Sequence, residues 1–76
     1  MKVRVKYFGI LSDKATRKDE TWADVSTLNE LIRAVKIKYQ TGEMIFASAV
    51  NEEWANGDIL LKEDDEVALM PPFAGG

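Results

Sequence analysis

The sequence predicts a small α+β fold in which one helix covers one face of a mixed β-sheet. Three observations lead to this prediction: an alternating strand pattern at the N-terminus, one amphipathic helix near the middle, and a second alternating strand close to the C-terminus. The chain has 76 residues, which is enough for one domain with a small core. Its hydrophobic content of 46% is too high for a disordered chain.

The first strand is predicted over residues 2–8. Apolar side chains at positions 3, 5 and 7 alternate with basic ones at positions 2, 4 and 6, as in a half-buried strand. Phe8 breaks the alternation, and is either core at the end of the strand or an exposed apolar contact. Gly9 ends the segment. Residues 10–18 are polar with room for one helical turn, and residues 19–23 predict a weaker second strand.

The helix is predicted to begin after Thr27, its N-cap, with Glu30 completing a capping box. An apolar stripe follows at helical spacing. It consists of Leu28, Leu31, Ile32, Val35 and Tyr39. Lys36 and Lys38 suit the negative end of the helix dipole, and Gly42 is predicted to stop the helix. We interpret the Arg and Lys side chains here as a solvated face.

The second half of the chain predicts three further strands. They cover residues 44–50, a short return at 54–55, and 66–70, where Val67 and Leu69 share one face. Polar turns at 51–53 and 56–58 separate the first two, and a short apolar run follows at 59–61. An acidic turn at 62–66 contains Asp residues that tolerate a left-handed conformation. Strand, strand, helix, strand, short strand, strand is the order of a β-grasp fold.

The amino-acid composition excludes several kinds of chemistry. The chain contains no cysteine and no histidine, so it has no disulfide, thiolate nucleophile, usual zinc site or histidine acid–base group. We therefore expect no metal site and a partner that performs any chemistry. The net charge of −3, with scattered basic residues, predicts no nucleic-acid partner. No apolar run approaches membrane-spanning length and the first residues lack a signal-peptide core, so we expect a cytoplasmic protein.

The C-terminal residues 70–76 are the most informative segment. Pro71 and Pro72 cannot continue a strand and favour an extended chain. Ala74, Gly75 and Gly76 are small, so no bulky side chain lies near the terminal carboxylate. We interpret residues 71–76 as a flexible tail whose tip enters a narrow channel of a partner. The alternative is an ordinary frayed chain end.

From the first strand to the tail, the sequence resembles the small sulfur-carrier subunit of molybdopterin synthase, in the wider MoaD/ThiS ubiquitin-like family. The resemblance is carried by residues 3–9, 27–28, 49–51 and 65–76. The ending Pro-Pro-x-x-Gly-Gly is its most specific part. Two positions depart from the family pattern: Asp64 stands where a glycine is frequent, and Phe73 where a smaller apolar residue is usual.

The resemblance implies a carrier that is not an enzyme on its own and binds no cofactor. An activating enzyme would use ATP to adenylate the Gly76 carboxylate, and a sulfur donor would convert it into a thiocarboxylate. The tail would then enter the large synthase subunit, within a heterotetramer, and donate sulfur to a pterin precursor. Gly75 and Gly76 are the expected reacting end. The expected partner-binding residues are Phe8, Met70, Pro71, Pro72, Phe73 and Ala74, whereas Tyr7 is expected in the core.

Three alternatives stay open at this point. The chain could carry sulfur for thiamine synthesis or for tRNA thiolation. It could be a ubiquitin-like modifier that is joined to target lysines through Gly76. It could also be a β-grasp interaction module whose tail is inert.

Overall fold

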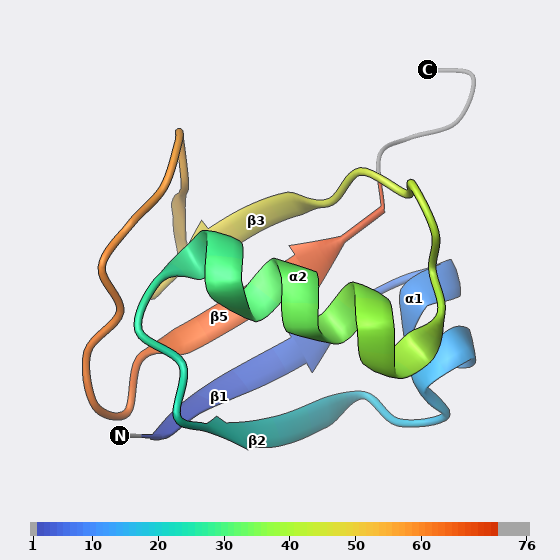
Figure 1. Cartoon of the computed structure of the whole chain (residues 1–76), viewed down its shortest axis with the longest axis horizontal. Coiled ribbons are helices and arrows are strands. Elements are labelled where there is room, and N and C mark those ends of the chain that lie inside the picture. The colour runs from blue at the N-terminus through green and yellow to red at the C-terminus, as the bar shows by residue number, and fades with distance from the viewer. Residues whose placement is uncertain (1, 72–76) are drawn as a thin grey trace.

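In the computed structural model, which describes residues 2–71, five strands form one mixed sheet and a long helix lies across one of its faces (Figure 1). The strands are β1 (Lys2–Tyr7), β2 (Asp19–Ala23), β3 (Ala47–Val50), β4 (Glu53–Trp54) and β5 (Glu66–Met70). The helices are α1 (Ile10–Ala15) and α2 (Leu28–Tyr39). The strand order is β2-β1-β5-β3-β4, with β1 and β5 parallel and the other pairs antiparallel. This is the predicted α+β, ubiquitin-like β-grasp fold.

The core lies between the sheet and α2. The alternating residues of β1 and β5 point into it, because Val3, Val5, Tyr7, Val67 and Leu69 are all buried. The apolar stripe of α2 faces them through Leu28, Leu31 and Val35, which are also buried. The predicted strand and helix faces are therefore confirmed. Each buried aliphatic side chain removed from water contributes about 1.5–3 kcal/mol, which is the main source of stability for so small a core.

The start of α2 follows the predicted capping pattern with one difference. The Thr27 hydroxyl accepts a hydrogen bond from the Glu30 amide at 3.2 Å, as an N-cap does. The Glu30 carboxylate reaches back to the amide of Ser26, one residue before the cap, at 2.9 Å. Asp58 accepts from the Asn29 amide at 2.9 Å, so a distant loop satisfies another free amide of the first turn.

The end of α2 differs from the prediction. Gln40, at φ 53°, takes the left-handed conformation that closes the helix, and Gly42 lies two residues beyond it. The third strand was also predicted too long, because residues 44–46 do not pair. Phe46 instead packs against the core, with the Lys36 ammonium 5.7 Å from its ring centroid. Ile45 is 71% exposed, so this apolar run does not form a strand.

Smaller shifts occur at three other predicted boundaries. The first strand stops at Tyr7 instead of Phe8, and the return strand is Glu53–Trp54 instead of 54–55. The helical turn predicted after Gly9 is α1. The apolar run at 59–61 makes one isolated bridge, Thr27 with Leu60.

Neither helix within residues 2–71 is long and apolar enough to cross a membrane.

We predict that Leu31→Ala lowers the free energy of unfolding by about 2–5 kcal/mol, because it leaves a cavity under α2. Leu31 is fully buried in the core cluster. Ile37→Ala is the matched control on the same helix, since Ile37 is 73% exposed, and it should change stability by about 0.5 kcal/mol or less. Urea unfolding of both variants measures the difference. Equal effects would mean that the buried face of α2 is assigned wrongly.

Candidate functional site: the base of the C-terminal segment

The predicted tail begins at the end of the central strand. β5 is paired on one side with β1 and on the other with β3, so its backbone is held from both sides. The last bonds are from the Phe8 amide to the Leu69 carbonyl, at 3.1 Å, and the pairing of Met70 with Ala47. Pro71 follows directly and has no amide hydrogen, so it cannot donate to the sheet. The central strand therefore fixes where residues 71–76 start.

The structure brings together three of the predicted site residues. Phe8, Met70 and Pro71 lie at the same end of the sheet, since Tyr7 is the register partner of Leu69. Phe8 is 45% exposed, whereas Met70 and Pro71 are half-buried. Phe8 is thus the exposed apolar residue and not the core residue. The other predicted site residues lie outside the described part of the chain: Pro72, Phe73, Ala74, Gly75 and Gly76.

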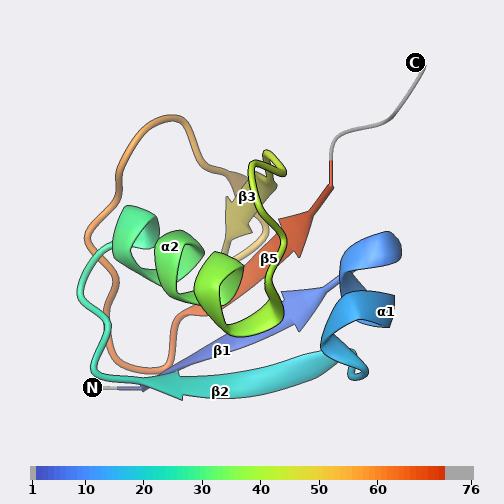
Figure 2. The ribbon, with the colours of Figure 1, turned by 45° about the vertical axis from the view of Figure 1, so that its right-hand side comes forward.

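Gly9 belongs to this site, although the sequence indicated only a strand breaker. A Cβ atom added at Gly9 would lie 3.3 Å from Cγ of Pro71. The backbone of Gly9 has φ 61° and ψ −141°, a region that L-residues other than glycine rarely adopt. Helix α1 starts immediately afterwards and lies at the end of the sheet where β5 stops (Figure 2). A glycine between a strand and a helical turn was the available signal.

The face of the sheet opposite α2 carries two alanines between a lysine and a tryptophan. The strand registers place Lys6, Ala68, Ala49 and Trp54 side by side across β1, β5, β3 and β4. Trp54 is 72% exposed at the edge of this row. Such a surface lets another backbone approach closely, and an aromatic residue at its border is typical of protein contacts. This row could not be predicted from the sequence, because it depends on the order of the strands.

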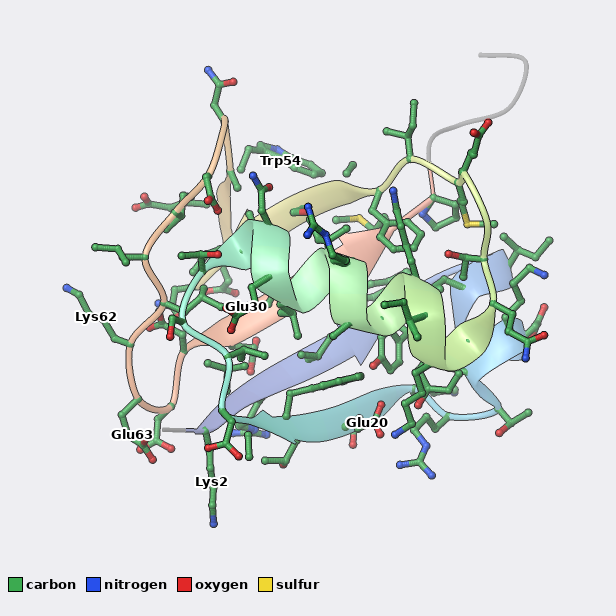
Figure 3. The ribbon with its side chains drawn as sticks, in the orientation of Figure 1. Lys2, Glu20, Glu30, Trp54, Lys62 and Glu63 are labelled. Carbon is green, nitrogen blue, oxygen red and sulfur yellow. The ribbon has the colours of Figure 1, made fainter. Side chains whose placement is uncertain are left out.

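Beneath the same end of the sheet, Glu20 forms a polar network on the core side of β2. Its Oε1 accepts hydrogen bonds from the hydroxyls of Tyr7 at 2.8 Å and Tyr39 at 2.6 Å. Its Oε2 pairs with the Lys38 ammonium, and the Tyr7 hydroxyl in turn accepts from Nε1 of Trp22 at 2.8 Å. Glu20 points from β2 toward the last turn of α2 (Figure 3). The network joins β1, β2 and α2 next to Phe8.

The surroundings of Glu20 shift several pKa values. Burial by itself would raise the pKa of Glu20, but hydrogen bonds from Lys38, Tyr39 and Tyr7 outweigh it and lower that pKa to about 2. Burial, together with the neighbouring carboxylate, raises the pKa of Tyr7 well above its ordinary value. The pKa of Tyr39 is raised for the same two reasons. The ionised carboxylate with two neutral phenols is therefore the stable state near neutral pH.

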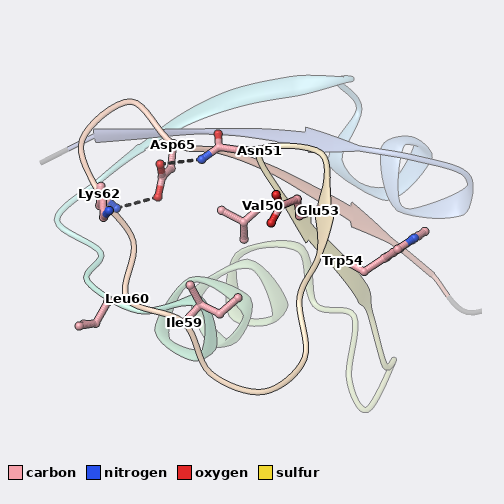
Figure 4. Close-up of a pocket in the computed structure, with 8 residues that line it drawn as sticks. All are labelled: Val50, Asn51, Glu53, Trp54, Ile59, Leu60, Lys62 and Asp65. Atoms are coloured by element: carbon pink, nitrogen blue, oxygen red, sulfur yellow. Dashed lines mark hydrogen bonds between the residues drawn. The ribbon is translucent and has the colours of Figure 1, made fainter.

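A separate hollow lies at the other end of β5. It is lined by Val50, Asn51, Glu53, Trp54, Ile59, Leu60, Lys62 and Asp65 (Figure 4). Asp65 accepts from the Asn51 side chain at 2.9 Å and from the Lys62 amide at 2.8 Å, and Asn51 accepts from the Glu66 amide at 3.0 Å. These polar groups are already used to hold the turn before β5. Asp64 in that turn has φ 66°, the predicted left-handed conformation.

Within residues 2–71, no cluster of three or more acidic, histidine or cysteine side chains is placed to hold a metal ion. The described site is thus a fixed strand end beside an exposed aromatic residue, with the row from Lys6 to Trp54 on the open face of the sheet. It can present the chain that follows Pro71 to a partner.

We predict that the stability supplied by Glu20 is present above pH 4.5 and is lost as the pH falls toward 2. The sign follows because its folded-state pKa, about 2, is below its ordinary value of 4.5, so the unfolded chain binds the proton first. The Glu20 side chain is only 8% exposed, and the loss should be about 2–3 kcal/mol. Urea unfolding across this pH range measures it. Glu20→Gln should remove most of this dependence, and an unchanged dependence in that variant would contradict the assignment to Glu20.

The fold and the strand end together define a ubiquitin-like β-grasp protein whose C-terminal segment follows the central strand. The comparisons with known proteins narrow this class. The model of the ThiS family matches residues 5–76, and the chain belongs to this family. ThiS-family proteins are non-catalytic sulfur carriers, and they are thiocarboxylated at the C-terminus after adenylation. A search of curated proteins found no match.

Solved structures agree with the fold. The chain is similar to a putative molybdopterin converting factor, subunit 1, from Pyrococcus furiosus, with a TM-score of 0.82 and 27% identity over 96% of this chain and 99% of that chain. It is similar to a chain in the complex of subunits 1 and 2 of the molybdopterin-converting factor from Helicobacter pylori, with a TM-score of 0.71, 26% identity and complete coverage of both chains, 100% each. It also shares the fold of small archaeal modifier protein 1 from Haloferax volcanii, with a TM-score of 0.80, 23% identity and coverage of 100% of both chains.

Proposed function

We propose that this chain is the sulfur-carrying small subunit of a molybdopterin synthase. The proposal rests on a ThiS-family match that reaches Gly76, together with a central strand that ends at Met70, directly before Pro71 and beside an exposed Phe8. Two similar structures above 25% identity are described as molybdopterin-converting factors, which favours this pathway over thiamine synthesis or tRNA thiolation. The partner described in one of them, subunit 2, corresponds to the large subunit proposed here.

The proposed chemistry takes place at the Gly76 carboxylate. A carboxylate is a poor electrophile, so an activating enzyme first joins it to the α-phosphate of ATP and releases pyrophosphate. Hydrosulfide supplied by a sulfur donor then attacks the acyl carbon and AMP leaves, which gives a thiocarboxylate. In the large subunit the sulfur bonds to the pterin precursor, and water cleaves the acyl–sulfur bond, so that the sulfur stays on the pterin and the carboxylate returns. Gly75 and Gly76 have no side chain to obstruct either channel.

In this proposal the described residues present the reacting end and the partner supplies the acid–base groups. Pro71 starts the segment at a fixed position, since β5 is held on both sides up to Leu69 and by β3 at Met70. Phe8 lies beside that start with nearly half of its surface open. Pro72, Phe73 and Ala74 complete the proposed docking segment. The whole chain, residues 1–76, acts as one domain with residues 71–76 as its tail.

We predict that incubation with the activating enzyme, ATP and a sulfur donor places one sulfur atom on Gly76. Replacing oxygen by sulfur adds about 16 Da, which methionine oxidation also adds, so the mass must be mapped to the C-terminal peptide. A thiol-selective alkylating reagent gives a cleaner readout, because the chain has no cysteine to react. A variant with one alanine appended after Gly76 is the control. It should fold as the wild-type chain does but remain unlabelled.

Each alternative function predicts a different fate of Gly76. Gly76 recovered in an isopeptide bond with a lysine of another protein would indicate a modifier. A thiocarboxylate that transfers sulfur only with a thiamine or tRNA enzyme would indicate another carrier pathway. An unlabelled wild-type chain, under conditions that label a known carrier, would contradict the carrier proposal and favour an inert tail.

We further predict that Phe8→Ala weakens binding to the large subunit about tenfold, as expected for loss of an aromatic contact near the centre of an interface. The effect on stability should be small, because Phe8 is 45% exposed. Ile37→Ala is the control, since Ile37 is exposed on α2, on the other side of the molecule from the open sheet face. Titration calorimetry with the large subunit measures the affinity of both variants. Equal affinity for wild type and Phe8→Ala would remove Phe8 from the interface.

A further inference from the structure

The backbone of Gly9 has a conformation that residues with a side chain rarely adopt. Its φ of 61° and ψ of −141° lie in a region that is essentially restricted to glycine. Gly9 is the N-cap of α1, but it has no side chain to accept a hydrogen bond there. A residue with a side chain would be strained in this conformation, so the position favours glycine.

The surroundings of Gly9 include the first residue of the predicted tail. An added Cβ would meet Cγ of Pro71 at 3.3 Å and Cδ at 3.6 Å, so the missing side chain leaves room for the proline ring. A distance of 3.3 Å is tighter than most Cβ contacts, so a side chain at position 9 would require a shift of a few tenths of an ångström between Gly9 and the Pro71 ring. Gly42 and Gly57 also have positive φ, but a Cβ added to either would meet no atom within 4 Å.

Three hydrogen bonds hold the Gly9 segment in place. The Phe8 amide donates to the Leu69 carbonyl at 3.1 Å, next to the strand end. The Gly9 carbonyl accepts from both the amide and the hydroxyl of Ser12, at 3.0 and 3.1 Å. Gly9 is therefore fixed to β5 on one side and to α1 on the other.

We propose that Gly9 is a positioning residue that sets the direction in which the chain leaves Pro71. This inference rests on the proposed function, because the direction matters when Gly76 must enter a partner's channel. Gly9 acts through Pro71 and does not touch the reacting atoms. A methyl group at position 9 would push the ring and turn the segment, so that fewer bound complexes hold the carboxylate at the activating site.

The test compares Gly9→Ala with Gly57→Ala as substrates of the activating enzyme, followed as pyrophosphate release. Gly57 has φ 91° with open space around it, so Gly57→Ala adds backbone strain without touching Pro71. Gly9→Ala should lower kcat about tenfold or more, because misplaced reactive groups react slowly. KM should stay the same or fall, since the docking surface is unchanged. Gly57→Ala should leave both constants near wild type. A rise in KM alone, or equal effects of the two variants, would overturn the inference.

The contact itself is tested by a double-mutant cycle with Pro71→Ala. If the added methyl acts on the proline ring, Gly9→Ala should lower kcat much less in the Pro71→Ala background than in the wild-type chain. Independent effects, whose fold-changes multiply, would overturn the proposed contact. Thermal unfolding of all variants verifies that each substrate is folded at the assay temperature.

A second readout does not depend on activity. The chain has no cysteine, so Asp13→Cys, at an exposed position of α1, accepts a single spin label. Paramagnetic broadening of the Ala74, Gly75 and Gly76 amide signals should change in Gly9→Ala and not in Gly57→Ala. Unchanged broadening would overturn the inference. If the wild-type chain is not adenylated at all, the proposed function fails, and this measurement alone decides the role of Gly9.

Discussion

The arrangement of this small protein depends on one buried carboxylate. Glu20 is placed on the core side of β2, where burial disfavours its charge, and the charge is kept because two phenols and one ammonium group bind it. The Lys38 side chain is 48% exposed, so the carboxylate is the buried member of this ion pair. The hydrogen bonds place Tyr7, Tyr39 and Lys38 around the two oxygens of Glu20. That placement fixes the end of β1 against the last turn of α2.

The same constraint extends to the proposed site. Tyr7 is the last residue of β1 and the register partner of Leu69, so the network holds the strand end from which Phe8 and Gly9 continue. At the other end of β5, Asn51 and Asp65 hold the turn that contains the left-handed Asp64. The central strand is therefore fixed at both ends and on both sides. Such a base suits a protein whose reacting group is proposed to lie several residues beyond its last strand.

Periodicity in the sequence predicted most of the fold, and the residues that escaped it depend on distant contacts. Alternation at residues 2–7 and the stripe from Leu28 to Tyr39 identified the core faces correctly. Residues 44–46 were predicted as strand because periodicity alone does not distinguish a short apolar strand from an apolar loop. In the structure these residues do not pair, and Phe46 packs against the core. Glu20 looked like an ordinary strand residue, since its partners are 13 to 19 positions away. Met70 and Pro71 belong to the tail motif, and Phe8 was predicted because it breaks the alternation of the first strand. Gly9 needed the strand order that places it beside Pro71.

Sulfur carriage and protein modification share a first step, because both need an activated C-terminal acyl group. They diverge at the nucleophile, which is sulfur in one case and a lysine amine in the other. This chain, without cysteine, supplies no thiol of its own, so in the proposed function the partner determines the product. Specificity must then reside in surfaces that partners recognise. Among the described residues, the surfaces that we propose for this role are Phe8 and the row from Lys6 to Trp54, next to the strand end where Gly9 is proposed to set the direction of the chain.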